Sequence, residues 1–326
     1  MTNLLHIEDL CVGFLVKKKQ INIIHHVSLD IAENEVLGVI GETGCGKSVT
    51  GSTILHLLPD NAVVSGRIEY KGADITHMKD REFQTLRGTE IVNIPQSPST
   101  SLDPLMHVGS QVSECVTERP DFKTQKEETK ASVRGKVLSI FRRLHIPDER
   151  FYQRYPCELS GGMCQRMLIA MGDITHPSLL VVDEPTKAID WVLRREVVNL
   201  LAELRDERKC AMMMITHDIG VARKLSDRIA VMYAGEIVEE GTPDQILNHP
   251  AHPYTKGLIA SLPENGFRVM EGFMPSFEDL PPGCRFSDRC PQADDHCRNH
   301  PPIFQNPSEG HRVLCHQCRE RVTEYA

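Results

Sequence analysis

The chain has 326 residues, of which 40% are hydrophobic and 25% charged, and its formal net charge at neutral pH is −8. This length suits one large domain with a smaller one, and the acidic balance argues against a general nucleic-acid binder, which would carry a basic excess. No apolar run approaches the roughly 18 residues that a membrane-spanning helix needs. The N-terminus has no basic stretch leading into an apolar one. We therefore expect a cytoplasmic protein that reaches a membrane only through a partner.

The first part of the chain predicts strands followed by a helix. Residues 5–31 alternate apolar and polar positions, with basic residues near the middle, which is typical of antiparallel strands joined by a turn. A short apolar run over 35–40 predicts a buried parallel strand, and the spacing over 48–58 predicts a helix that Pro59 stops.

The middle of the chain continues this alternation. Helix-favouring, charged sequence covers about 124–144. Buried strands are predicted over 179–182 and 211–215, and a helical stretch over 192–208 lies between them. Strand–helix–strand alternation of this kind predicts an α/β fold with a mostly parallel sheet.

A glycine-rich segment lies between the strand over 35–40 and its helix. Residues 41–48 read Gly-Glu-Thr-Gly-Cys-Gly-Lys-Ser, which is the phosphate-loop pattern. Glycines let backbone N–H groups surround phosphate oxygens, and the following helix points its positive end at the same anion. Lys47 adds a charge near the β- and γ-phosphates, and the Ser48 hydroxyl can bind magnesium. The segment therefore predicts binding of a nucleoside triphosphate.

Two carboxylates, Asp183 and Glu184, end the apolar strand over 179–182. An apolar strand carries such groups to the edge of the sheet where ligands bind. We expect Asp183 to hold magnesium and Glu184 to orient and polarise the attacking water.

Residues 159–166, Leu-Ser-Gly-Gly-Met-Cys-Gln-Arg, closely resemble the signature motif of ABC transporter ATPases, and they precede Asp183 at the expected distance. The resemblance implies a phosphate-loop NTPase core with an antiparallel β-subdomain and a helical subdomain at about 97–172. It also implies that ATP is sandwiched between two subunits. Ser160, Gly161 and Gly162 would then donate to the γ-phosphate from across that interface.

Further landmarks of the family have counterparts here. Gln96 resembles the Q-loop glutamine, residues 188–190 the D-loop, and His217 the switch histidine. The resemblance implies catalytic roles for Lys47, Gln96, Glu184 and His217 and magnesium ligands at Ser48, Gln96 and Asp183. It implies ATP contacts for Phe14, whose ring would stack on adenine, and for Gly41, Glu42, Thr43, Gly44, Cys45, Gly46, Lys47, Ser48, Val49, Ser160, Gly161 and Gly162.

Four positions depart from the family pattern: Pro95, Cys164, Lys187 and Ile189. None of them removes a catalytic group, so we expect hydrolysis-competent sites. Lys187 and Ile189 leave the geometry of the D-loop open.

A composition change follows Pro263, after which prolines are frequent and apolar residues thin. Such a segment must dock on the main domain or be stapled. We place the boundary there, giving a nucleotide-binding domain over 1–262 and a small irregular C-terminal domain over 263–326.

The tail and two earlier segments indicate a branch of the family. Residues 252–255 (His-Pro-Tyr-Thr), 101–104 (Ser-Leu-Asp-Pro) and 283–286 (Gly-Cys-Arg-Phe) resemble hallmarks of the dipeptide and oligopeptide importer ATPases. That resemblance implies peptide import, a second and different ATPase subunit, two transmembrane permeases and an extracytoplasmic solute-binding protein. It places the chain on the cytoplasmic face of the inner or plasma membrane, with no nucleic-acid partner.

Five of the 11 cysteines crowd into the tail. In the importer branch, four such cysteines hold a four-iron, four-sulfur cluster, and Cys284, Cys290, Cys297 and Cys315 could supply its thiolates. Zinc is an alternative, because Cys315 and Cys318 form a Cys-x-x-Cys pair with histidines nearby. Unligated thiols are the third reading.

Three other functions compete with peptide import. The same motor could serve nickel, a metal chelate or another small solute, and this chain alone does not discriminate them. A soluble ABC ATPase acting on ribosomes or DNA repair would usually carry two cassettes or long coiled-coil insertions, which are absent. A non-hydrolysing regulatory subunit is disfavoured by the complete set of Lys47, Asp183, Glu184 and His217.

Overall fold

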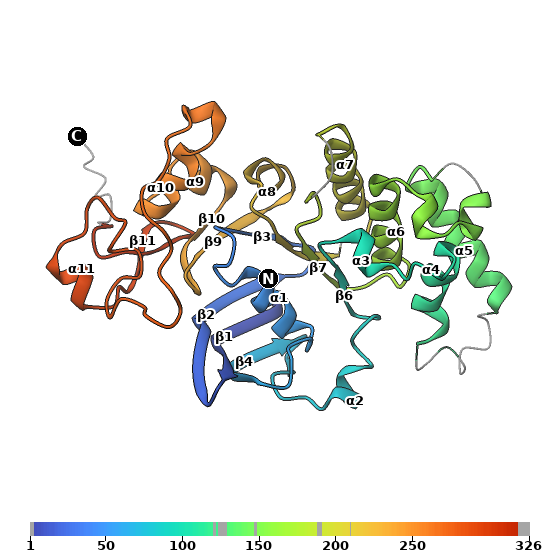
Figure 1. Cartoon of the computed structure of the whole chain (residues 1–326), viewed down its shortest axis with the longest axis horizontal. Coiled ribbons are helices and arrows are strands. Elements are labelled where there is room, and N and C mark those ends of the chain that lie inside the picture. The colour runs from blue at the N-terminus through green and yellow to red at the C-terminus, as the bar shows by residue number, and fades with distance from the viewer. Residues whose placement is uncertain are drawn as a thin grey trace. The chain divides into compact units, whose positions relative to one another are not determined.

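The protein is described by a computed structural model that covers residues 3–119, 122, 129–146, 149–187, 191–208 and 210–318 (Figure 1). The chain forms two compact units. Unit 1 consists of Met1–Leu4, Ala32–Glu35 and His77–Met214, and unit 2 of Leu5–Ile31, Val36–Thr76 and Ile215–Ala326. Within the described ranges, no helix has both the length and the apolar character needed to cross a membrane.

Unit 2 contains the predicted antiparallel strands. They form a four-stranded sheet in the order β2-β1-β4-β5. Its strands are β1 (Asn3–Val16), β2 (Lys19–Ala32), β4 (Ala62–Tyr70) and β5 (Ala73–Asp74). The turn between β1 and β2 is made by Lys17 and Lys18, both with positive φ (46° and 69°), as expected for a two-residue hairpin connection. The predicted hairpin is therefore confirmed.

A second set of strands in unit 2 joins segments far apart in the sequence, in the order β11-β12-β10-β9-β3. These are β3 (Val36–Ile40), β9 (Arg228–Tyr233), β10 (Glu236–Gly241), β11 (Phe304–Ser308) and β12 (His311–Leu314). Strand β3 pairs in parallel with β9, and the remaining pairs are antiparallel. The C-terminal tail thus docks on its unit by adding strands to the edge at β10.

The helices of unit 2 follow its strands. They are α1 (Lys47–Ile54), α8 (Ile219–Leu225), α9 (Pro243–Leu247), α10 (Pro253–Ala260) and α11 (Asp295–Asn299), with a 3₁₀ turn, η4, at Pro263–Asn265. Helix α1 is shorter than the predicted 48–58, because His56 adopts a left-handed conformation with φ 52° and so reverses the chain before Pro59. A core that includes the fully buried rings of Tyr233 and Tyr254 lies beneath the tail.

Unit 1 holds the other buried strands, in the order β8-β7-β6. Their bounds are β6 (Ile91–Ile94), β7 (Leu179–Asp183) and β8 (Ala211–Ile215). Every residue of β8 is buried, which fits its unbroken apolar sequence. The parallel pairing of β6 with β7 confirms the predicted α/β character.

Helices dominate the rest of unit 1. They are α2 (Asp80–Phe83), α3 (Pro98–Ser101), α4 (Val108–Thr117), α5 (Lys130–Arg143), α6 (Gly161–Asp173) and α7 (Trp191–Arg208), with 3₁₀ turns η2 (Glu149–Gln153) and η3 (Pro156–Glu158). Helix α4 packs on both α5 and α6 (Figure 1). Helix α5 begins later than the predicted 124–144, at a capping box made by Thr129 and Ser132, and residues 123–128 lie outside the described ranges.

Candidate functional site

The glycine-rich loop joins β3 to α1 in a conformation that only glycine tolerates. Gly41, Gly44 and Gly46 have φ values of 153°, 84° and 115°. A Cβ on Gly41 would lie 2.1 Å from the carbonyl oxygen of Met232, and one on Gly46 would lie 2.6 Å from Cδ1 of Ile24. The glycines are therefore needed both for the turn and for the close approach of neighbouring chain.

Lys47 is held at the mouth of this loop. Its side chain is buried, and Nζ donates to the carbonyl oxygens of Gly41 and Glu42, each at 2.8 Å. Gly44 and Ser48 are exposed. The loop's own carbonyls thus orient the ammonium, while the exposed backbone and hydroxyl can receive an anion and its metal.

Two further predicted residues belong to unit 2. Phe14 lies near the end of β1, paired with Ala62 of β4, and is half-buried. His217 is exposed just after β8. The preceding residue, Thr216, donates its N–H to the carbonyl oxygen of Val39 in β3 at 3.1 Å. His217 therefore leaves the sheet beside the strand that leads into the glycine-rich loop.

In unit 1, Gln96 and the two carboxylates leave the sheet at the same edge. Ile94 of β6 pairs with Val182 of β7 in a parallel ladder, so Gln96, just after β6, and Asp183, the last residue of β7, lie at the same ends of neighbouring strands. Glu184 is buried and has a positive φ of 47°, an uncommon conformation for a residue with a side chain. A buried carboxylate on strained backbone is typical of a functional position.

The segment that resembles the family signature starts helix α6. Ser160 is its N-cap, and its hydroxyl accepts a hydrogen bond from the backbone N–H of Met163 at 3.3 Å. Ser160 and Gly161 are exposed, whereas Gly162 is buried. The predicted D-loop, residues 188–190, lies outside the described residues.

The four tail cysteines predicted to bind a metal line one narrow pocket in unit 2: Cys284, Cys290, Cys297 and Cys315. Two of them are joined through the backbone, because the N–H of Cys284 donates to the carbonyl oxygen of Cys297 at 2.7 Å. Burial raises the pKa of the Cys284 thiol to about 12, and the other three sulfurs add to the effect. Among the described residues, no three His, Cys, Asp or Glu side chains are placed to hold a single metal ion.

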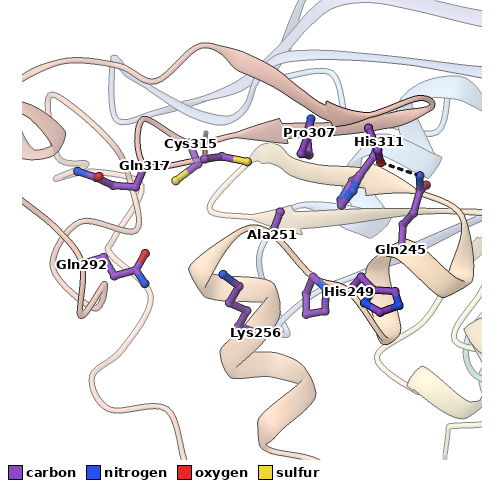
Figure 2. A pocket seen from close by; sticks show the side chains of 12 residues that line it. Gln245, His249, Ala251, Lys256, Gln292, Pro307, His311, Cys315 and Gln317 are labelled. Atoms are coloured by element: carbon purple, nitrogen blue, oxygen red, sulfur yellow. Dashed lines mark hydrogen bonds between the residues drawn. The ribbon is translucent and has the colours of Figure 1, made fainter. Parts of the chain in front are cut away.

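A larger pocket, of about 400 Å³, lies beside this cysteine pocket. Cys315 lines both pockets, while Cys318 lines only the larger one. In Figure 2, Lys256 and His249 lie on the opposite side of the larger pocket from Cys315. The fifth tail cysteine, Cys318, thus shares the larger pocket with Cys315, and burial together with the nearby Cys315 sulfur raises the pKa of the Cys318 thiol.

Sequence reasoning missed two residues that touch the glycine-rich loop. Arg289 forms an ion pair with Glu42 at 3.0 Å, and the hydroxyl of Tyr254 accepts from the N–H of Glu42 at 2.9 Å. Residues 252–255 and the tail are visible in the sequence as motifs. Nothing in a linear pattern, however, pairs Arg289 with a residue 247 positions earlier.

Two family models match the chain. The ABC transporter model covers residues 24–187, and the model of the oligopeptide/dipeptide transporter C-terminal region covers residues 238–297. The second match includes three of the four pocket cysteines, Cys284, Cys290 and Cys297.

Curated relatives resemble the chain over nearly its full length. It is 38% identical to the dipeptide transport ATP-binding protein DppD of Bacillus subtilis, over 97% of this chain and 95% of that protein. It is 36% identical to the oligopeptide transport ATP-binding protein OppD of Salmonella typhimurium, over 92% and 90%. A solved dimeric ATP-binding cassette, bound to ADP and Pi in a post-hydrolysis state, is 26% identical with a TM-score of 0.64, over 73% of this chain and 98% of that one. The chain thus belongs to the ABC transporter ATP-binding proteins, and it is an ATPase that couples ATP hydrolysis to transport.

Proposed function

We propose that this chain powers the import of di- or oligopeptides through an ABC transporter. The observation that carries the proposal is the presence, on one chain, of both the ABC match and the oligopeptide/dipeptide C-terminal match. The names of relatives such as the dipeptide and oligopeptide transport proteins of Bacillus subtilis support the same cargo. No comparable observation favours nickel or another small solute.

The proposed chemistry assigns each predicted residue a task. The loop from Gly41 to Val49, which includes Lys47, binds the nucleotide phosphates, and the ring of Phe14 stacks on the adenine base. Magnesium prefers oxygen ligands, which Ser48, Gln96 and Asp183 offer, and it would neutralise phosphate charge in the transition state. The common sheet edge of Gln96 and Asp183 supports this set.

Glu184 and His217 complete the proposed hydrolytic group. The buried carboxylate of Glu184 would orient and polarise the attacking water, and His217 would contact the γ-phosphate. The exposure of His217 leaves its ring able to reach a ligand.

We further propose that ATP is shared with a second, different ATPase subunit. Ser160 and Gly161 stand exposed at the start of α6, where a hydroxyl and N–H groups can meet a phosphate of the other subunit. Bound ATP would then favour the closed arrangement of the two ATPase subunits over the open one. Hydrolysis would remove the γ-phosphate contact and let the subunits separate. Two permeases in the membrane and an extracytoplasmic binding protein complete the proposed transporter, with this chain on the cytoplasmic face.

For the tail, we propose that Cys284, Cys290, Cys297 and Cys315 hold a four-iron, four-sulfur cluster. The support is that four thiols, the donor set such a cluster requires, line one pocket. A single zinc ion needs its sulfurs within about 2.3 Å of one point, whereas a cluster spreads its thiolates over several irons. Among the described residues no group is placed to hold one metal ion, so the proposal rests on the shared pocket and on the thiol donor set alone.

Reconstituted transport tests the proposed function. The complex that co-purifies with this chain is placed in proteoliposomes with its binding protein, and ATP-dependent uptake of a labelled dipeptide and of nickel is measured. We expect peptide uptake with no nickel uptake. Glu184→Gln should abolish peptide uptake, because it removes the carboxylate that acts on water. Glu203→Gln, the same change at an exposed helix position, should leave uptake unchanged. Nickel uptake without peptide uptake would contradict the proposed cargo.

A further inference from the structure

The glycine-rich loop is tied to the cysteine-bearing tail by an ion pair. Nη1 of Arg289 donates to both carboxylate oxygens of Glu42, the second residue of the loop, at 3.0 and 3.1 Å. The side chains are 6% and 30% exposed. A largely buried pair of this kind is screened less by solvent than a surface pair, and removing one partner leaves the other charge without compensation.

Contacts other than the one with Glu42 also fix the side chain of Arg289. Its Nε donates to the carbonyl oxygen of Glu271 at 3.1 Å, and its guanidinium lies over the rings of Tyr233 and Phe286 at 5.7 and 5.8 Å. A guanidinium held by stacking and by a backbone acceptor has little freedom left to lose when it binds a carboxylate. The tail therefore presents Arg289 to the loop in a preset orientation.

A second tether acts on the backbone of the same loop residue. The N–H of Glu42 donates to the hydroxyl of Tyr254 at 2.9 Å. Tyr254 is fully buried, and its ring packs against Tyr233 and Phe286, with centroids 4.6 and 5.5 Å apart. Glu42 is thus held through its side chain and its backbone, and one aromatic cluster supports both contacts.

The position of Glu42 matters for phosphate binding. Its carbonyl oxygen accepts from Nζ of Lys47 at 2.8 Å and from the N–H of Cys45 at 3.3 Å. If Glu42 moves, the acceptor that orients the Lys47 ammonium moves with it. A binding-competent loop that is populated only part of the time binds its ligand more weakly by that fraction.

At its other end, Arg289 belongs to the cysteine segment. It directly precedes Cys290, and its N–H donates to the carbonyl oxygen of Phe286 at 3.1 Å. The N–H of Ser287 donates in turn to the carbonyl oxygen of Cys284 at 3.0 Å. Residues 284–290 therefore form one short hydrogen-bonded turn that carries two cysteines and the arginine.

We propose that Arg289 is a positioning residue through which the cysteine-bearing segment, residues 284–290, sets the geometry of the phosphate loop and hence the affinity for MgATP. The inference rests on the proposed role of the loop in binding ATP. It assigns the tail a task in the nucleotide cycle, because a rearrangement of residues 284–290 would shift Arg289 and, through the ion pair, the position of Glu42.

MgATP binding to the full chain, measured with a fluorescent ATP analogue, tests this inference. We expect Arg289→Gln to weaken binding on the order of 10-fold, the equivalent of losing roughly 1.4 kcal/mol. Arg289→Lys keeps the charge but loses the planar guanidinium, whose separate nitrogens contact Glu42 and Glu271, and it should weaken binding by about 3-fold. In the assembled transporter, Arg289→Gln should raise KM for ATP while kcat at saturating ATP stays unchanged, a split that general destabilisation would not produce.

Arg298→Gln is the matched control. Arg298 lies in the same tail, but its ion pair with Asp288 is open to solvent, with 51% and 71% of the side chains exposed. We expect wild-type affinity from it. Glu42→Gln should weaken binding as Arg289→Gln does, and the double variant should be no weaker than either single one, because both remove the same interaction.

Equal MgATP affinity in Arg289→Gln and the wild type, or losses that multiply in the double variant, would overturn the inference while leaving the proposed function intact. A wild-type chain that binds no MgATP would instead overturn the proposed function and the inference with it.

Discussion

His252 is a histidine that the fold keeps neutral. It is 1% exposed and caps helix α10, with Nδ1 accepting a hydrogen bond from the N–H of Tyr254 at 3.0 Å. Burial lowers its pKa to about 4, even though the nearby carboxylate of Glu239 acts in the opposite direction. A proton on Nδ1 would also remove the acceptor that caps the helix, so folding selects the uncharged ring.

Acid should therefore destabilise the protein through His252. The unfolded chain takes up this proton near pH 6.5 and the folded chain near pH 4, so the contribution to stability is lost as the pH falls from 6.5 towards 4. Between pH 7.5 and pH 5 the loss is about 2 kcal/mol. His252→Asn keeps a capping oxygen but cannot titrate. Urea unfolding at both pH values should show the wild type losing about 2 kcal/mol more than the variant. Equal losses in the two proteins would contradict the assignment.

At the same scale, local and long-range site residues differ in how far the sequence predicts them. Gly41 and Lys47 belong to a contiguous pattern whose geometry follows from the residue types, and the structure has that geometry. Arg289 and Tyr254 contact the loop only because β9, β10 and the tail bring distant segments together. Their role depends on tertiary packing, which no local spacing encodes.

Elements show the same division between local and long-range causes. The apolar runs predicted as strands correspond to β3, β7 and β8, whose residues are almost all buried. Strand β11, in contrast, has polar residues and a proline, a sequence that disfavours a strand. It is extended because β12 pairs with it, and β12 is itself aligned on β10 through Val313 and Glu239. The neighbouring strand, rather than intrinsic propensity, determines its conformation.

Ser160, at the start of helix α6, is expected to have two roles: it caps the helix and it donates to ATP. Ser160 caps the helix, so Ser160→Ala should cost about 1 kcal/mol of stability and also remove a donor to ATP. Ser160→Asp separates the two roles, because aspartate is as good a cap as serine but repels a phosphate. We expect Ser160→Asp to have the same melting temperature as the wild type. In sedimentation experiments it should nevertheless lose ATP-dependent association with its partner ATPase.

Ser160→Thr is the matched control for this helix start. It retains a capping hydroxyl that can also donate, so association should persist. ATP-dependent association of Ser160→Asp at the wild-type level would exclude Ser160 from the shared site.

For the molecule as a whole, the tail raises a question of stability. Its segment from Pro263 onward is rich in proline and poor in apolar side chains. Within unit 2, this segment is tied to the rest of the unit by the β10–β12 pairing and by a buried hydrogen bond between Nε2 of His311 and the carboxylate of Glu239 at 2.7 Å. Small segments of this kind usually need a covalent or metal staple in addition, because their burial cannot offset the conformational entropy lost on ordering.

Removing a cysteine ligand should therefore loosen the tail without unfolding unit 1. We expect the anaerobically purified wild type to contain iron and sulfide and to absorb visible light, and Cys297→Ser to lose both metal and colour. Because a bound metal stabilises only the folded tail, limited proteolysis should cut Cys297→Ser after about residue 263 and spare the wild type. Cys157→Ser changes an exposed cysteine of unit 1 and should match the wild type in metal content and in digestion pattern. If the wild type is colourless and contains zinc, the four cysteines form a zinc site and the cluster assignment is wrong. A metal-free wild type with a protease-resistant tail would instead show that strand pairing and the His311–Glu239 bond suffice to hold the tail.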